Sequence, residues 1–305
     1  MWLNQFTMNV LTHTLPITLQ TARKARRLSQ LELSLRVGVS QRHVSFVESG
    51  RAKPSRTLLM AWLHELDAPL AVRNAAMLQA GYAPAFSTAA LTDPLLAQAN
   101  DALVQLLKAH DPMPAFVLDS LWNVLQFNQG GQWLAATLMP SLTMGLAESL
   151  AAAVPVGPAS AAATRTSSSL NMLDLLAHPL GFAQNMVNLH GVGPILLAHL
   201  RDDASVQPAL APKVEAFAAL LRDRLGAQNL HSGWPYQTAP LLTARFATPH
   251  GELAFFSMFS TFGTPQDITL ASLRVEHMFA ADDPTRAVLA QQVVRGTLHT
   301  ASNAK

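Results

Sequence analysis

Gln41 and Arg42, directly after Ser40, are two neighbouring side chains that can read nucleic-acid bases. In the major groove of DNA, a glutamine can form two hydrogen bonds with adenine and an arginine can form two with guanine. Ser40 is of the residue type that caps a helix, so Gln41 and Arg42 would occupy the first helical turn, with Ser45 one turn further on. The pattern predicts a helix that contacts base edges through Gln41, Arg42 and Ser45.

A second helix is expected immediately before this one. Ser29 and Glu32 have the spacing of a capping box, and Gly38 is of the type that ends a helix in the left-handed conformation. Leu31 and Leu35 fall on one face of this helix, and we expect them to lie in the core. Two short helices joined by a glycine-containing turn are the parts of a helix-turn-helix, although an ordinary helical hairpin inside a bundle is the alternative.

This stretch resembles the helix-turn-helix of the phage-repressor-like XRE family of transcription regulators. The resemblance rests on Leu28-Ser29-Gln30, Gly38-Val39-Ser40, Val47-Glu48-x-Gly50 and Pro54-Ser55. Further helices are expected over residues 17–27, 56–66 and 69–81. We therefore predict a five-helix, lambda-repressor-like DNA-binding domain over residues 1–85, in which residues 1–15 form a loosely ordered leader.

Four further residues are candidates for contacts with DNA phosphates. Gln30 and Ser40 stand at helix N-termini, where backbone N–H groups hold anions, and Arg51 and Lys53 follow the second helix. Members of the XRE family commonly pair an arginine of the first helix with the glutamate of the Val-Glu-x-Gly segment. Arg23 and Glu48 match those positions, so the resemblance implies a structural ion pair between them.

Charge is distributed unevenly along the 305 residues. Residues 1–85 hold ten Lys or Arg and four Asp or Glu, a balance of +6, whereas the remainder holds 11 and 15, a balance of −4. A small basic domain joined to a larger, mildly acidic one is typical of a nucleic-acid reader attached to a second function. The length suits two domains, and we expect the second to span residues 86–305.

The sequence argues against several other classes of protein. The absence of cysteine excludes disulfides, thiolate metal sites and a cysteine nucleophile. No apolar run has the length of a membrane helix, and no signal peptide is visible, so a cytoplasmic protein without membrane contact is expected. The chain carries no catalytic motif, and its eleven histidines are scattered. We expect no enzymatic activity, no cofactor and no metal; an enzyme fused to a DNA-binding domain is the weakest interpretation.

The larger domain has the pattern of an α+β fold. Five strands are expected, two early (115–119 and 122–128) and three late (241–248, 253–262 and 268–279), with helices between them. Asn128 is expected to cap a helix. Residues 147–169 are rich in Ala, Ser and Pro, and their second half is expected to form a flexible surface excursion. The pattern is typical of a PAS-like antiparallel sheet covered by helices on one face.

The larger domain also resembles the MmyB-like ligand-binding domain, which follows the helix-turn-helix in many XRE-type regulators. The resemblance rests on residues 74–84 (NAAMLQAGYAP), 114–128 (PAFVLDSLWNVLQFN), 171–203 and 263–285. It implies a PAS-like fold that binds small apolar molecules similar to fatty acids. A domain that serves only for dimerisation or protein interaction is the alternative.

The residues expected to hold such a ligand are aromatic and face one side of the sheet or its covering helices. They are Phe116, Phe127, Trp133, Phe182, Phe246, Phe255 and Phe259, with His277 as the candidate for contact with a head group. A core histidine is the alternative for His277. Alternation leaves open whether Leu253, Phe255 and Phe259 or Ala254, Phe256, Met258 and Phe262 point inward. We also expect a homodimer on double-stranded DNA, since one helix-turn-helix buries little DNA surface.

Overall fold

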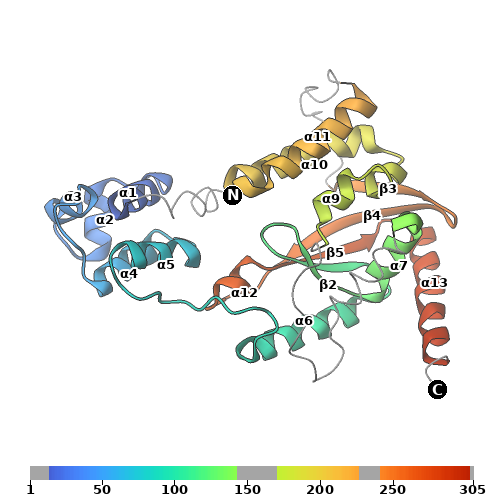
Figure 1. Ribbon diagram of the computed structural model, residues 1–305, viewed down its shortest axis with the longest axis horizontal. Coiled ribbons are helices and arrows are strands. Elements are labelled where there is room, and N and C mark those ends of the chain that lie inside the picture. Colours follow the sequence, from blue (N-terminus) through green and yellow to red (C-terminus); the bar gives the residue numbers. More distant parts are fainter. Residues whose placement is uncertain (1–13, 143–169, 227–240, 303–305) are drawn as a thin grey trace. The chain divides into compact units, whose positions relative to one another are not determined.

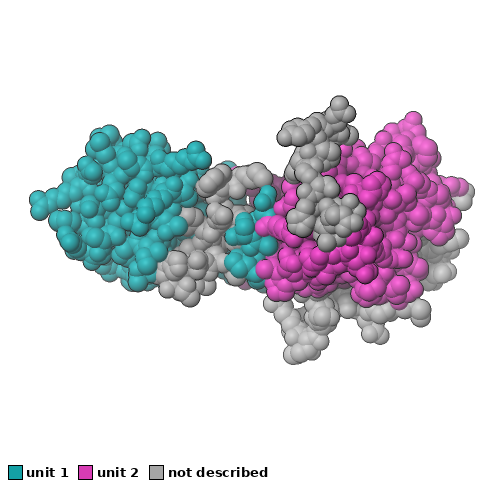
Figure 2. All heavy atoms as spheres, turned by 90° about the horizontal axis from the view of Figure 1, so that it is seen from above, with its two compact units in different colours: residues 1–91, 202–209, 264–271 teal, residues 92–201, 210–263, 272–305 magenta. Residues whose placement is uncertain are grey.

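The structure is a computed structural model that describes residues 14–142, 170–226 and 241–302 (Figure 1). Residues 147–169, whose second half was expected as a surface excursion, and residues 1–13 of the predicted leader 1–15 lie outside the described residues. Leu15, the last residue of that leader, begins the first helix. The chain divides into two compact units, coloured separately in Figure 2. Unit 1 comprises residues 1–91, 202–209 and 264–271; unit 2 comprises residues 92–201, 210–263 and 272–305.

Five short helices form the N-terminal part of unit 1. They are α1 (Leu15–Ala25), α2 (Gln30–Val37), α3 (Gln41–Glu48), α4 (Arg56–Glu65) and α5 (Leu70–Gln79). Serine caps set three of the boundaries, because Ser29, Ser40 and Ser55 each accept a hydrogen bond from the backbone three residues later. Gly38 ends α2 at φ 72°, a conformation that favours glycine. The helices enclose a core that includes the fully buried Trp62.

The inner face of α2 differs from the prediction. Leu31 and Leu35 are 52% and 74% exposed, whereas Leu33 is fully buried and Ser34 is 2% exposed. The prediction that Leu31 and Leu35 belong to the core was therefore wrong. Their neighbour Ser34 faces inward because its small side chain allows the close approach of the adjoining helices, and its hydroxyl donates to the Leu31 carbonyl.

Two buried polar side chains organise the segment after α5. The Asn74 side chain donates to the Phe86 carbonyl at 2.7 Å and accepts from the backbone N–H groups of Ala85 and Phe86. The Asp267 carboxylate, on the 264–271 segment of the same unit, accepts from the Ser87 hydroxyl at 2.6 Å and from the Ala89 backbone at 3.2 Å. Unit 1 is thus completed by residues that are distant in the sequence.

Unit 2 is built on a five-stranded antiparallel sheet of order β2-β1-β5-β4-β3. The strands are β1 (Ala115–Leu118), β2 (Val124–Phe127), β3 (Thr243–Thr248), β4 (Gly251–Ser260) and β5 (Arg274–Ala280). The helices assigned mainly to this unit are η1 (Pro94–Leu96), α6 (Ala97–His110), α7 (Gln129–Leu138), α9 (Met172–Ala177), η2 (Phe182–Asn185), α10 (Leu189–Val206), α11 (Ala211–Leu225) and α13 (Asp283–Ser302). The two remaining short helices are η3 (Pro208–Leu210) and α12 (Ile268–Ser272).

These elements confirm the predicted α+β fold with five N-terminal helices and a five-stranded antiparallel sheet. Asn128 caps α7 as expected, accepting a hydrogen bond from the Gly131 backbone. The strand predicted over residues 268–279 was too long, because the short helix α12 occupies residues 268–272 and β5 begins only at Arg274.

Residue pairing divides the sheet into two faces. Phe116 lies opposite Phe127 and Glu276, and Glu276 lies opposite Phe259, so these side chains share one face, which we call the cavity face. The adjacent pair, Met258 and His277, belongs to the opposite face. This settles the ambiguity in β4: the set that contains Phe255 and Phe259 is on the cavity face.

Helices contact both faces of the sheet, whereas the sequence predicted cover on one face. Helices α7 and α9 and the turn η2 pack against the cavity face, where they share a cavity lining with β1 and β2. On the opposite face, Leu103 and Leu106 of α6 line a groove together with Val275 of β5. The end of α6 contacts the same face, since the rings of His110 and His277 lie 4.9 Å apart.

Candidate nucleic-acid interface and ligand-binding face

The first turn of α3 presents the predicted base-reading residues to solvent. Gln41 and Arg42 are exposed and Ser45 is half-buried. Ser40 fixes the start of the helix, because its hydroxyl accepts from the His43 backbone at 3.2 Å. The guanidinium carbon of Arg42 lies 5.1 Å from the centre of the Phe46 ring, one turn further along. This stacking favours a defined direction for an exposed arginine.

A buried ion pair fixes the helix that carries these residues. Arg23 donates through Nε to Glu48 Oε1 at 2.7 Å and through Nη2 to Oε2 at 2.8 Å, and the two side chains are 9% and 1% exposed. Arg23 Nη1 also donates to the Leu28 carbonyl at 2.6 Å. The hydrogen bond with Glu48 raises the pKa of Arg23 further. The ion pair implied by the family resemblance is present, and it joins α1 to the end of α3.

Gln30 takes part in the same network. Its side-chain amide donates to Glu48 Oε2 at 2.9 Å, and the residue is half-buried. The bond orients the amide toward the ion pair, so Gln30 supports the placement of α3 in addition to its predicted phosphate contact. A lone glutamine at a helix start gave no sequence signal for this second role.

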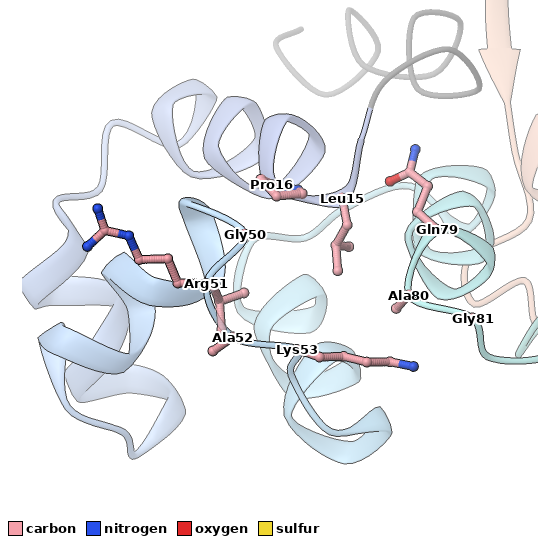
Figure 3. Close-up of a pocket in the computed structure, with 10 residues that line it drawn as sticks. Leu15, Pro16, Gly50, Arg51, Ala52, Lys53, Gln79, Ala80 and Gly81 are labelled. Carbon is pink, nitrogen blue, oxygen red and sulfur yellow. The ribbon is translucent and has the colours of Figure 1, made fainter.

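Arg51 and Lys53 border a hollow of about 460 Å³ in unit 1, but their side chains point in opposite directions (Figure 3). Both residues are exposed. The Lys53 ammonium lies 4.8 Å from the centre of the Tyr82 ring, and the Tyr82 hydroxyl donates to the Pro54 carbonyl at 2.9 Å. The structure therefore does not bring the two predicted phosphate contacts together, and Lys53 is engaged with the segment that follows α5.

The cavity face of unit 2 encloses a small apolar cavity of about 20 Å³. Strands β1 and β2 contribute Phe116, Val124 and Phe127, and the other walls come from α7, Leu170, α9 and Phe182 of η2. Three of the predicted ligand residues, Phe116, Phe127 and Phe182, thus meet at one place. Gly131 of α7 permits the close approach, because a Cβ there would lie 3.0 Å from the Phe116 ring.

The other predicted ligand residues lie elsewhere. Phe246 and Phe255 are 4% and 1% exposed and pack against each other on the cavity face, with ring centres 6.3 Å apart. Phe259 is on the same face but 49% exposed. Trp133 does not line the cavity. Its ring lies 5.6 Å from that of His250, in the turn between β3 and β4.

His277 is on the opposite face of the sheet from these aromatic residues, so the prediction that it shares one face with Phe116 and Phe259 was wrong. Its Nε2 is within 2.9 Å of the Ser260 hydroxyl, and its ring contacts His110. Burial and the neighbouring His110 lower the pKa of His277. The prediction failed because both faces of β5 are covered, which places apolar residues on each.

Comparison with known families identifies both units. The MmyB-like transcription regulator ligand binding domain matches residues 99–291, and a helix-turn-helix family matches residues 19–72. The chain belongs to the MmyB-like transcription regulators. It is a DNA-binding transcription regulator with a ligand-binding domain. No curated protein matches the chain. No helix formed by the described residues is long and apolar enough to cross a membrane.

In this MmyB-like regulator, sequence reasoning missed three residues of the cavity face, Trp122, Arg274 and Glu276. The guanidinium carbon of Arg274 lies 3.9 Å from the centre of the Trp122 ring, and the Ser257 hydroxyl donates to Glu276 at 2.8 Å. Burial raises the pKa of Glu276. The sequence signal was available, because Arg274 and Glu276 alternate with Val275 and His277, but apolarity assigned Val275 and His277 to the face that holds Phe116 and Phe259.

Proposed function

We propose that this chain is a homodimeric transcription regulator that reads its operator through Gln41 and Arg42 and responds to a fatty-acid-like apolar molecule. The observation that carries the first part is the exposed first turn of α3, capped by Ser40 and held by the buried Arg23–Glu48 pair. A recognition helix contacts bases through its N-terminal residues. The proposal assigns the chain no catalytic step and places it in the cytoplasm with its DNA.

A binding-site selection tests the base-reading roles. Arg42→Ala is expected to cost about 1–3 kcal/mol at one base pair and to relax the preference there, as expected for loss of a bidentate contact. Lys24→Ala, which removes an exposed charge from α1, serves as the control and should keep the preference. An unchanged operator preference in Arg42→Ala would rule out its base-reading role.

Arg51 is proposed to contact a phosphate. Its removal should weaken binding to every sequence alike and reduce the dependence of affinity on salt, by about one unit in slope. The same measurement on Lys53→Ala should show a smaller change in slope, because the Lys53 ammonium is already placed against the Tyr82 ring. Equal effects of the two substitutions would contradict this distinction.

The proposal of an apolar ligand is supported by the aromatic cavity lining and by the family to which the chain belongs. A cavity of about 20 Å³ has room for about one water molecule, and pockets for small molecules are about 300–1,000 Å³. An acyl chain must therefore displace side chains, and it would shift the protein only through its difference in affinity between conformations. Thermal shift and operator binding across a series of fatty acids and acyl esters test this part.

The small cavity also favours a second candidate, in which the larger domain serves only for dimerisation or protein interaction. The two candidates differ in their response to acyl compounds: a domain used only for association should show no stabilisation by any of them. Light scattering of the free protein and of its DNA complex tests the homodimer, which a monomer in both samples would exclude.

A further inference from the structure

The outward side of α3 carries an aromatic residue. Arg42, Phe46 and Ser49 are spaced by four and three residues, so they follow one side of the helix. The other side holds Val44 and Val47, which are 0% and 1% exposed and belong to the core of unit 1. Phe46 therefore lies on the side of α3 that is turned away from the core.

Phe46 has no part in the hydrophobic core of unit 1. Among the described residues, neither that core nor the partly buried apolar side chains packed against it include Phe46, which is itself half-buried. Its carbonyl accepts hydrogen bonds from the backbone N–H groups of Arg51 and Ala52, at 2.8 and 3.1 Å. The backbone of Phe46 thus holds the loop after α3, but core packing does not explain a large apolar side chain at this position.

The Phe46 ring supports the guanidinium of Arg42, whose central carbon lies 5.1 Å from the centre of the ring. A guanidinium that stacks through its flat face can still form hydrogen bonds through its N–H edge. When this edge forms two hydrogen bonds with a guanine, the guanidinium lies in the plane of the base pair. A ring over its flat face then lies at the level of the adjacent base pair, about 3.4 Å away along the DNA.

An aromatic ring at that level can distinguish thymine from the other bases. Thymine presents a methyl group in the major groove, whereas adenine, guanine and cytosine present hydrogen-bonding groups without one. A phenylalanine ring gains contact with the methyl group, but it offers no hydrogen bond to a polar group that it dehydrates. The ring therefore favours a thymine at the base pair next to the one that Arg42 contacts.

We propose that Phe46 reads the 5-methyl group of a thymine adjacent to the guanine that Arg42 contacts. The operator then contains a thymine and a guanine at neighbouring base pairs, and Phe46 is a specificity residue in addition to Arg42. This inference rests on the proposed base reading by Arg42, and it adds a second base and the chemical group by which that base is recognised.

The test starts from a binding-site selection on the full-length protein, which identifies the guanine whose preference is lost in Arg42→Ala. The thymine of the neighbouring base pair is then replaced by deoxyuridine, which lacks only the methyl group. The wild type should bind the deoxyuridine operator about three- to fivefold more weakly, because the contact with one methyl group is lost. Cytosine and 5-methylcytosine at the same position should differ by a similar factor, in favour of the methylated base.

Two variants assign this effect to a side chain. Phe46→Ala should bind the thymine and deoxyuridine operators equally well and keep a preference for the guanine, since Arg42 remains. Phe86→Ala is the matched control, because it removes another half-buried phenylalanine of unit 1 that lies outside the core, in the segment after α5. It should leave the ratio of the two affinities as in the wild type.

The wild-type comparison needs no variant to fold. Equal binding of the thymine and deoxyuridine operators, or a selected operator without thymine next to that guanine, would overturn the role of Phe46. The base reading by Arg42 would then still be supported by the loss of the guanine preference in Arg42→Ala. A selection without any base preference would overturn both proposals together. A methyl effect of full size in Phe46→Ala would assign the contact to another residue and overturn this inference alone.

Discussion

Replacing Arg23 by methionine should destabilise the DNA-binding helices far more than the loss of an ordinary surface charge. The change leaves the Glu48 carboxylate, whose side chain is 1% exposed, with the Gln30 amide at 2.9 Å as its remaining contact in this network. It also removes the 2.6 Å hydrogen bond to the Leu28 carbonyl. Removing one partner of a buried ion pair costs about 3–5 kcal/mol, because water cannot replace the lost contacts.

Hydrogen exchange of the full-length protein can measure this cost in unit 1 alone. Exchange of the slowest amides in α1, α2 and α3 should accelerate by a factor of roughly 10² to 4 × 10³, given about 1.4 kcal/mol per factor of ten. Asp67→Asn is the matched control, because Asp67 is 70% exposed where it pairs with Arg26. Such a surface pair contributes about 0–1 kcal/mol to stability, so the exchange rates of the same amides should change little.

A double variant distinguishes the cost of an unpaired buried charge from the cost of losing the ion pair itself. Arg23→Met combined with Glu48→Met replaces both charges by apolar side chains, and such replacements are often neutral or stabilising. The double variant should therefore be more stable than Arg23→Met alone. If Arg23→Met cost less than about 1 kcal/mol, the pair would behave as an exposed one, and the argument that it fixes α3 would fail.

Three further changes have defined outcomes. Ser29→Ala should cost about 1 kcal/mol, seen as faster exchange in α2, because the capping box loses its hydroxyl; unchanged exchange would contradict this. Gly130→Ala should destabilise unit 2 by about 1–3 kcal/mol and lower its melting temperature, because a Cβ would lie 2.4 Å from the Pro112 carbonyl oxygen. An unaltered melting temperature would show that the backbone can shift freely. Because the pKa of His277 is lowered in the folded protein, the unfolded chain binds a proton at a pH where the folded chain does not. Stability should therefore fall as the pH drops below about 6.5. His277→Gln should flatten this part of the plot of melting temperature against pH.

The helix-turn-helix could be predicted because its signals are local. The hydroxyls of Ser29 and Ser40 accept hydrogen bonds from backbone N–H groups three residues later, and Gly38 ends its helix through its own positive φ. All partners of these interactions therefore lie within a few residues in the sequence. Local signals do not determine which face of α2 is buried. Leu31, Leu33 and Leu35 are equally apolar, and the packing of the neighbouring helices alone decides that Leu33 is the buried one.

The same limit explains the error in the faces of β5. Alternation correctly separated Val275 and His277 from Arg274 and Glu276, but it could not say which set shares a face with Phe116 and Phe259. Helix α6 covers the opposite face, so apolar residues are required there too. The alternative weighed for His277, a histidine bonded within the protein, describes its contact with Ser260 better than a head-group role does.

Asp267 has a consequence for the exchange of domains between regulators. The 264–271 segment connects β4 to β5 along the chain, yet its carboxylate holds Ser87 and Ala89, and the Thr269 hydroxyl donates to the Ala89 carbonyl at 2.6 Å. A chimera joined near residue 91 would separate these partners, although the helices themselves remained intact. A transplant of this helix-turn-helix unit must therefore carry two pieces of sequence. The 264–271 segment has to be moved together with the recognition helix.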